Sequence, residues 1–181
     1  TLQRRFQKLV EIAPSPSLTP ALRAQLQGAA LTLARAVAYE GLGTFEFLVD
    51  LRSEDLPFVF IETNARLQVE HTITEEVTGI DLVQAQVRLA AGARLAQLGL
   101  DAAAPPPVRG CAIQWRINAE TLDAQGNAVP GSGRLARFDL PGGPGVRVDS
   151  HGQAGSAPSP HYDTLLAKLI VTAPDGFEAA L

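Results

Sequence analysis

The chain has 181 residues, of which 46% are hydrophobic and 19% charged, and its formal net charge is −4. This composition predicts a folded, core-forming protein rather than a disordered one, and 15 basic against 19 acidic residues leave no basic excess for a nucleic acid. The single cysteine, Cys111, excludes an internal disulfide and a cysteine-based zinc site. No apolar run is long enough to span a membrane and no signal peptide opens the chain, so we expect a cytoplasmic protein without a nucleic-acid or membrane partner. Because the sequence holds no methionine and opens on Thr1, we expect it to be a piece of a longer chain.

Two helices are predicted in the first half of the chain. Thr19 is a suitable N-cap, Pro20 fits the first helical position, and apolar residues then recur at three- and four-residue steps, which predicts a helix that ends before Gly41. Asp81 is expected to cap a second helix over residues 82–91.

Strands are predicted from runs of β-branched and aromatic residues. Residues 44–49 and 58–62 form two such runs around a polar stretch with a proline, which predicts neighbouring antiparallel strands. Residues 93–107 are rich in alanine, leucine and proline and indicate a domain boundary. Beyond it we expect short strands at residues 111–117, 133–139, 146–149 and 165–172. Residues 175–181 resemble the first turn of a helix.

The most informative stretch is residues 60–71. If it remains extended, Glu62, Asn64, Arg66, Gln68 and Glu70 share one face. Glu46 joins this set, because its neighbours on the preceding strand are core-type phenylalanines. Two carboxylates and an amide oxygen are the ligands that Mg²⁺ or Mn²⁺ prefers. The pattern therefore predicts a metal–nucleotide site that uses Glu46, Glu62 and Asn64.

The same face carries groups suited to a small anion. Arg66 offers a planar fork for an oxyanion, and Glu70 is a carboxylate close to that cation that could act as a general base. The competing interpretation is the solvated face of an edge strand, on which polar residues commonly alternate. The absence of Lys, Ser or Thr from this face favours the site.

The run from Phe60 to Val83, FIETNARLQVEHTITEEVTGIDLV, resembles the signature of biotin carboxylase, the ATP-grasp component of biotin-dependent carboxylases such as acyl-CoA, pyruvate or urea carboxylases. The likeness covers nearly the whole chain. Its further segments are Gln3–Lys8, Arg88–Gly92, Arg116–Glu120, Pro141–Arg147 and Tyr162–Lys168.

The resemblance implies an α+β fold. Residues 1–95 would form the C-terminal half of an ATP-grasp domain, residues 96–107 a linker, and residues 108–181 most of a small, β-rich biotin carboxylase C-terminal domain. The N-terminal half, including the glycine-rich lid with its ATP-binding lysine, would precede Thr1, so this piece alone should bind ATP poorly and be inactive.

The resemblance also implies a role for each site residue. The metal would be held by Glu46, Glu62 and Asn64. Bicarbonate and the carboxyphosphate made from it would be bound by Lys8, Arg66, Gln68 and the backbone of Val69. Glu70 would deprotonate bicarbonate, and Arg116 would bind biotin and stabilise its enolate. Metal and cations would then offset the charge on the transferring phosphoryl group.

The cofactors and substrates implied are ATP, Mg²⁺ or Mn²⁺, bicarbonate, and biotin on a carrier domain. The implied partners are that carrier domain, a carboxyltransferase domain or subunit, the missing N-terminal half of the biotin carboxylase and, as in many family members, a second copy in a homodimer. The final carboxyl acceptor stays open, because the transferase domain would decide it.

Two positions depart from the family pattern. Phe6 replaces a histidine that is usual near the nucleotide, and this puts a polar ATP contact in doubt. Cys111 stands where many members have histidine, which should change packing only. His71 would lie on the face opposite Glu70 and is interpreted as structural. His151 and His161 lack metal-ligand spacing with a second histidine or cysteine and are interpreted as surface or turn positions. Asp163 and Lys168 lie in the family-like tail, where a role in the fold is expected.

Two other functions remain open from the sequence. Another ATP-grasp ligase, of the carbamoyl-phosphate synthase type, shares the Glu-x-Asn-x-Arg pattern. A scaffold or dimerisation piece with an idle site would also carry these residues.

Overall fold

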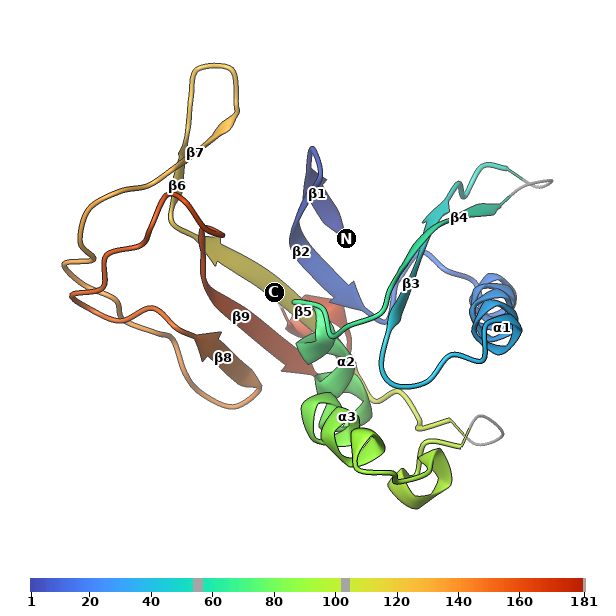
Figure 1. Cartoon of the computed structure of the whole chain (residues 1–181). Coiled ribbons are helices and arrows are strands. Elements are labelled where there is room, and N and C mark those ends of the chain that lie inside the picture. The colour runs from blue at the N-terminus through green and yellow to red at the C-terminus, as the bar shows by residue number, and fades with distance from the viewer. Residues whose placement is uncertain (54–56, 102–104, 181) are drawn as a thin grey trace. The chain divides into compact units, whose positions relative to one another are not determined.

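The computed structural model describes residues 1–53, 57–101 and 105–180. It divides into two compact units, one made of Thr1–Ala13 with Arg109–Leu181 and the other of Pro14–Val108. Both helices and sheets are present, which confirms the predicted α+β class (Figure 1). The first 13 residues group with the C-terminal unit, while the predicted domain bounds stay a prediction.

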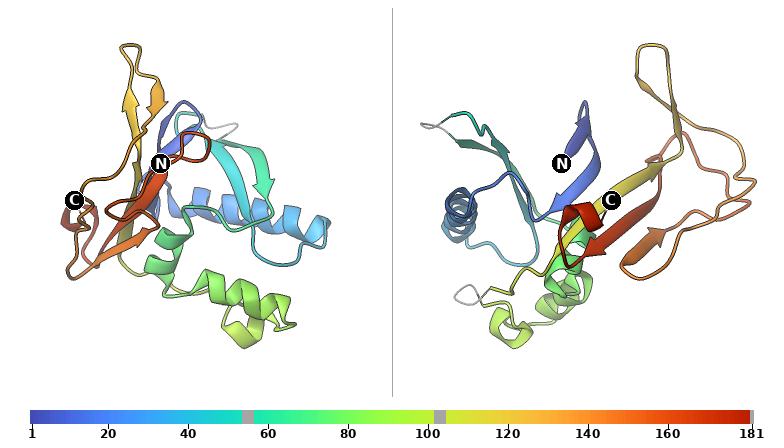
Figure 2. Two further views of the ribbon diagram at one scale, coloured as in Figure 1. Left: turned by 60° about the vertical axis from the view of Figure 1, so that its left-hand side comes forward. Right: turned by 180° about the vertical axis from the view of Figure 1, so that it is seen from behind.

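The first unit is built on a five-stranded antiparallel sheet in the order β1-β2-β5-β9-β8 (Figures 1 and 2). The strands are β1 (Leu2–Arg4), β2 (Gln7–Ala13), β5 (Cys111–Asn118), β8 (Val146–Ser150) and β9 (Leu165–Ala173). A separate hairpin pairs β6 (Glu120–Leu122) with β7 (Ala128–Pro130). The strands expected at residues 111–117, 146–149 and 165–172 are thus confirmed.

One face of this sheet is apolar. Its buried cluster contains Cys111, Ile113, Ala173 and Ala180, and Trp115 and other apolar residues pack against it. The short 3₁₀ helix η2 (Phe177–Ala179) covers part of this face, where the sequence predicted the first turn of a helix. The Cys111 thiol lies 3.6 Å from the carbonyl oxygen of Ala173. Cys111 therefore fills the core.

The second unit contains a two-stranded antiparallel sheet and helices. Its elements are α1 (Pro20–Ala36), β3 (Thr44–Val49), β4 (Phe58–Asn64), α2 (His71–Thr78), α3 (Leu82–Ala90) and the 3₁₀ helix η1 (Leu95–Leu98). β3 and β4 pair as predicted, with Phe47 packing edge-to-face on both Phe58 and Phe60.

Side-chain caps fix the starts of two helices. Thr19 accepts a hydrogen bond from the backbone N–H of Leu22 at 3.2 Å, which caps α1, and Asp81 accepts one from Gln84 at 2.7 Å, which caps α3. Both predicted helix starts are confirmed. None of the helices in the described ranges is long and apolar enough to cross a membrane.

Two local predictions were wrong. The stretch of residues 60–71 stops being extended after Asn64, turns at residues 69–70 and enters α2, a helix that the sequence did not indicate. The β-branched residues of α2 disfavour a helix. The helix nevertheless buries Ile73 and Val77, one turn apart, which are 8% and 4% exposed. It ends at Gly79, which has a left-handed backbone conformation. Residues 133–139 form no strand, because only Leu135 exchanges backbone hydrogen bonds there, with Gly155 and Ser156.

Candidate functional site

The predicted metal ligands come together on the β3–β4 pair. Glu46 and Glu62 are directly opposite each other across the two strands, next to an irregularity between Glu46 and Phe47. The side-chain amide of Asn64 donates to Glu46 Oε1 at 3.2 Å and to Glu62 Oε1 at 2.8 Å. Gln68 donates to the same Glu46 oxygen at 2.9 Å. We call these four residues the carboxylate–amide cluster.

Hydrogen bonds within the cluster explain how two carboxylates tolerate each other. Like charges directly opposite on paired strands destabilise a sheet, and the Asn64 amide lies between them as a shared donor. A rotation of that amide by half a turn presents its oxygen instead of its nitrogen. The cluster then offers two carboxylates and one amide oxygen to a cation.

An orphaned polar atom provides an independent test of whether a cation fits. Gln68 Oε1 is buried and has no hydrogen-bond partner within the described structure. A buried acceptor without a partner is costly, and a cation or one of its bound waters would satisfy it. Among described residues, no group of three or more His, Cys, Asp or Glu forms a metal site. The cluster instead combines two carboxylates with the side-chain amides of Asn64 and Gln68, and carboxylate and amide oxygens are the kind of ligand that Mg²⁺ prefers.

The remaining residues of the predicted polar face follow the strand in a turn. Arg66 is exposed and its guanidinium donates to the carbonyl of Leu67 at 3.2 Å. Val69 and Glu70 form the turn before α2, and Glu70 occupies its N-cap position. The single strand face expected for Glu62 to Glu70 is thus replaced by a strand end and a turn, since the backbone bends after Asn64. Gln68 nevertheless reaches Glu46 across this bend.

His71 reinforces the turn. Its Nδ1 lies 2.7 Å from the carbonyl oxygen of Gln68, and its backbone N–H donates to the same oxygen at 3.2 Å. This contact supports the structural role expected of His71. It also fixes the backbone on which Gln68 is carried.

Lys8 and Arg116 belong to the other unit, on the paired strands β2 and β5. Lys8 is half-buried. The Arg116 Nε–H donates to Glu11 Oε1 at 2.6 Å, and a second guanidinium nitrogen forms an ion pair with the same oxygen. Gln114 donates to Glu11 Oε2 at 2.9 Å.

Sequence reasoning missed Glu11 and Gln114. Their side chains are 2% and 0% exposed, although both types are normally exposed. The sequence does contain a signal for Glu11, because it is the lone glutamate within the apolar run Leu9–Ala13. A glutamate buried in such a run requires a partner for its charge. Its partners are more than 100 residues away in the sequence, so the pairing itself could not be predicted.

A second charged group lies on β8 and β9. Arg147 donates to both oxygens of Asp149 at 2.9 and 3.2 Å, and the Lys168 ammonium is 3.2 Å from Asp149 Oδ2. Burial raises the pKa of Asp149, but the hydrogen bond from Arg147 and the charge of Lys168 outweigh it and hold that pKa below its ordinary value. Lys168 thus has the structural contact expected of it.

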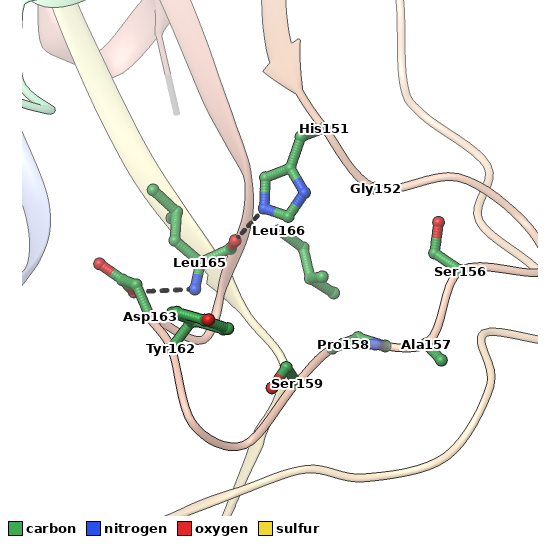
Figure 3. Close-up of a pocket in the computed structure, with 10 residues that line it drawn as sticks. All are labelled: His151, Gly152, Ser156, Ala157, Pro158, Ser159, Tyr162, Asp163, Leu165 and Leu166. Atoms are coloured by element: carbon green, nitrogen blue, oxygen red, sulfur yellow. Dashed lines mark hydrogen bonds between the residues drawn. The ribbon is translucent and has the colours of Figure 1, made fainter.

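A pocket of about 420 Å³ in the first unit contains none of the predicted catalytic residues (Figure 3). His151 Nε2 lies 2.6 Å from the carbonyl oxygen of Leu165, and Asp163 accepts a hydrogen bond from the backbone N–H of Leu165 at 2.9 Å (Figure 3). His161 is exposed. These contacts hold the chain entering β9, as a structural role for His151 and Asp163 requires.

Comparison with known proteins gives the family. Residues 1–98 match the model of the carbamoyl-phosphate synthase L chain, ATP binding domain, and residues 114–181 match the biotin carboxylase C-terminal domain. A biotin carboxylase of Nostoc sp. is 47% identical over 97% of the chain, which spans 37% of that protein. Pyruvate carboxylase 1 of Caenorhabditis elegans is 49% identical over 96% of the chain, which spans 14% of it.

Solved structures agree. A single-chain, multi-domain long-chain acyl-CoA carboxylase superposes with a TM-score of 0.90 at 46% identity over 99% of this chain and 19% of its own. The biotin carboxylase domain dimer of Hydrogenobacter thermophilus 2-oxoglutarate carboxylase, solved with MgADP, ADP and bicarbonate, gives 0.85 at 41% identity over 99% of this chain and 37% of its own. The chain therefore belongs to the biotin carboxylase family, with an ATP-binding domain of the carbamoyl-phosphate synthase L chain type followed by a biotin carboxylase C-terminal domain.

Proposed function

We propose that the protein carrying these residues carboxylates biotin on a carrier domain, with ATP and bicarbonate as substrates and carboxyphosphate as the activated species. The carboxylate–amide cluster is the observation that carries this proposal, because it assembles an oxygen donor set in a chain that also bears the biotin carboxylase C-terminal domain. Two related biotin carboxylase domains, one solved with bicarbonate and one with MgADP and bicarbonate, support the choice of substrates.

In this proposal Glu46, Glu62 and Asn64 would hold Mg²⁺, and the ion would supply positive charge for the ATP phosphates. The contact of Gln68 with Glu46 and its unpartnered Oε1 support a role for Gln68 beside this site. Lys8, Arg66, Gln68 and the Val69 backbone bind bicarbonate and carboxyphosphate by charge and hydrogen bonds.

Two residues handle the proton and the developing charge. Glu70 takes the proton from bicarbonate, so that the bicarbonate oxygen can attack the γ-phosphate. Arg116 binds the ureido oxygen of biotin and stabilises negative charge there. Because Glu11 already holds its guanidinium, Arg116 is partly ordered before biotin arrives.

The carboxyl group would pass from the carrier domain to an acceptor bound by a carboxyltransferase domain or subunit, and two copies of the biotin carboxylase would form a homodimer. We expect the 181-residue chain alone to cleave ATP poorly, because it spans 37% of a biotin carboxylase relative. Adding purified 181-residue chain to an ATP-cleavage assay tests this, and turnover equal to that of the full-length protein would contradict it.

The experiment that tests the function measures ATP cleavage by the full-length protein with Mg²⁺ and bicarbonate. Stimulation by free biotin is the expected result. Stimulation by ammonia instead would support a carbamoyl-phosphate synthase activity, which is the second candidate because the matched ATP-binding family carries that name. Specific ligands stabilise a folded protein by mass action. If the protein cleaves no ATP and its melting temperature does not change with Mg²⁺ and ATP, it is a scaffold.

A further inference from the structure

A buried carboxylate lies within the apolar run Leu9–Ala13 of strand β2. Glu11 is 2% exposed and has Val10 and Ile12 as neighbours, both of which pack against the apolar core on the opposite face of the sheet. Such a carboxylate is expensive unless its charge and its oxygens are both satisfied. Its position therefore needs an explanation beyond filling space.

Both oxygens of Glu11 are used, each by a different residue of β5. Gln114 is directly opposite Glu11 in the strand register and donates to Oε2 at 2.9 Å. Arg116, two residues along, donates from Nε to Oε1 at 2.6 Å and also pairs with Oε1 through a second nitrogen. The fully buried Gln114 thus fixes the plane of the carboxylate, and the carboxylate fixes the guanidinium.

The strand register gives Arg116 a cation as its other neighbour. Arg116 is paired directly with Lys168 on β9, and Lys168 is paired with Asp149 on β8. Glu11 contacts Arg116 diagonally from β2, so charged side chains follow one another from Glu11 through Arg116 and Lys168 to Asp149. Like charges on directly opposite residues repel, so Asp149 compensates Lys168 while Glu11 compensates Arg116.

A fixed arginine binds its substrate at a lower entropic cost than a mobile one. An arginine side chain loses rotamer freedom when it becomes fixed, and a side chain that is already held in place does not lose that freedom on binding. The Arg116 side chain is 13% exposed and held at its Nε edge. The guanidinium of Arg116 is therefore already held in place, as a group that stabilises charge on a substrate should be.

We propose that Glu11, held by Gln114, is the positioning residue that orients Arg116 for biotin. This inference rests on the proposed function. Glu11 itself touches neither biotin nor ATP in this account, and its effect passes through Arg116. A purely structural ion pair would instead support the sheet without affecting one substrate more than another.

The test compares Glu11→Gln with Glu120→Gln in the full-length protein. Glu120 is the matched control, because it is a partly buried glutamate paired with Arg4 at 2.5 Å in the same unit. Glu11→Gln should lower kcat/KM for biotin by about 100-fold, the cost of misplacing a catalytic group. Bicarbonate-dependent ATP cleavage without biotin should stay at the wild-type rate in both variants, and Glu120→Gln should keep kcat/KM for biotin.

A double-mutant cycle separates positioning from support of the fold. In an Arg116→Ala background, Glu11→Gln should cause no further loss of kcat/KM for biotin, because the residue through which it acts is gone. An equal further loss in that background would overturn the proposal. Gln114→Leu should lower kcat/KM for biotin in the same direction by a smaller factor, and it provides a second variant if Glu11→Gln fails to fold.

A readout without turnover separates this proposal from the proposed function. Phenylglyoxal modifies arginines, and peptide mass mapping follows the modification of Arg116 alone. Glu11→Gln should make Arg116 react several-fold faster, with no change in Glu120→Gln. Equal Arg116 reactivity in wild type and Glu11→Gln would overturn the positioning role. If Arg116 reacts more slowly in wild type than in Glu11→Gln but the wild-type protein does not carboxylate biotin, only the proposed function is overturned.

Discussion

Glu46 and Glu62 are directly opposite each other on β3 and β4, and one amide, that of Asn64, donates to both carboxylates. Without a cation, this amide is the shared donor that the structure provides between the two charges. With a cation, the same three side chains can present oxygens to it. If the proposed cation binds here, its occupancy should therefore affect the stability of this strand pair.

Replacement of Asn64 should therefore affect both metal dependence and stability. Asn64→Ala removes a ligand and the shared donor, so we expect the Mg²⁺ concentration for half-maximal ATP cleavage to rise at least about tenfold. Without Mg²⁺ the melting temperature should fall, because the two carboxylates then lack their common donor. Titration of full-length enzyme with Mg²⁺ measures the first effect. Thr63→Ala, at the neighbouring position of the same strand, is the control, and equal Mg²⁺ dependence in the two variants would contradict the assignment.

Glu70 is the proposed base, and its replacement should stop chemistry rather than binding. Glu70→Gln keeps the shape of the side chain but cannot accept the bicarbonate proton, so bicarbonate-dependent ATP cleavage should fall by about 100-fold or more. Nucleotide affinity, measured by equilibrium binding of MgATP, should be unchanged. Glu76→Gln, within the helix α2 that Glu70 precedes, serves as control. Normal turnover by Glu70→Gln would rule out this role.

Arg116 should matter for biotin and not for nucleotide. Arg116→Ala is expected to keep Mg²⁺ and ATP binding while lowering kcat/KM for biotin by about 100-fold or more, since it removes a charge-stabilising group. The measurement is biotin carboxylation alongside MgATP binding by the same preparation. Loss of nucleotide affinity would show that Arg116 acts elsewhere in the cycle.

Asp149 should contribute acid sensitivity to the first unit. Its pKa lies below the ordinary value when the protein is folded, so the stabilisation is present above the unfolded pKa of about 4 and is lost as pH falls through the lower, folded pKa. Asp149→Asn should lower the melting temperature near neutral pH and reduce its dependence on pH below about 4. Melting of the variant and of an Asp139→Asn control across pH 3–7 checks this. An unchanged acid slope would refute the contribution.

Gly145 should be intolerant of a side chain. It has φ +74°, and an added Cβ would lie 2.6 Å from the carbonyl oxygen of Thr172, whose N–H donates back to Gly145 at 2.8 Å. Gly145→Ala should destabilise the protein by about 1–3 kcal/mol. Gly28→Ala is the matched control, because a Cβ there meets nothing within 4 Å and alanine favours the interior of α1 by about 0.5–1 kcal/mol. Chemical denaturation compares them, and equal stability of the two variants would contradict this.

Local patterns predicted much of the fold. The caps Thr19 and Asp81 and the aromatic runs of β3 and β4 act within a few residues, so they are visible in the sequence. Helix α2 was missed, because its signal is burial of Ile73 and Val77 by tertiary packing and not helix propensity.

The candidate site was predictable to a similar extent. Alternation along β4 placed Glu62 and Asn64 on one face, and the strand pairing added Glu46. The bend after Asn64 and the contact of Gln68 with Glu46 could not be read from alternation. The Glu11–Arg116 pair joins residues 105 positions apart, and only the pairing of β2 with β5 brings them together.

Biotin carboxylation is tested most directly by following label from ¹⁴C-bicarbonate into biotin. The full-length protein with MgATP should form acid-labile labelled carboxybiotin, on free biotin or on its carrier domain, and Glu70→Gln should form none. If wild-type protein hydrolyses ATP but transfers no label to biotin, the proposed function is wrong.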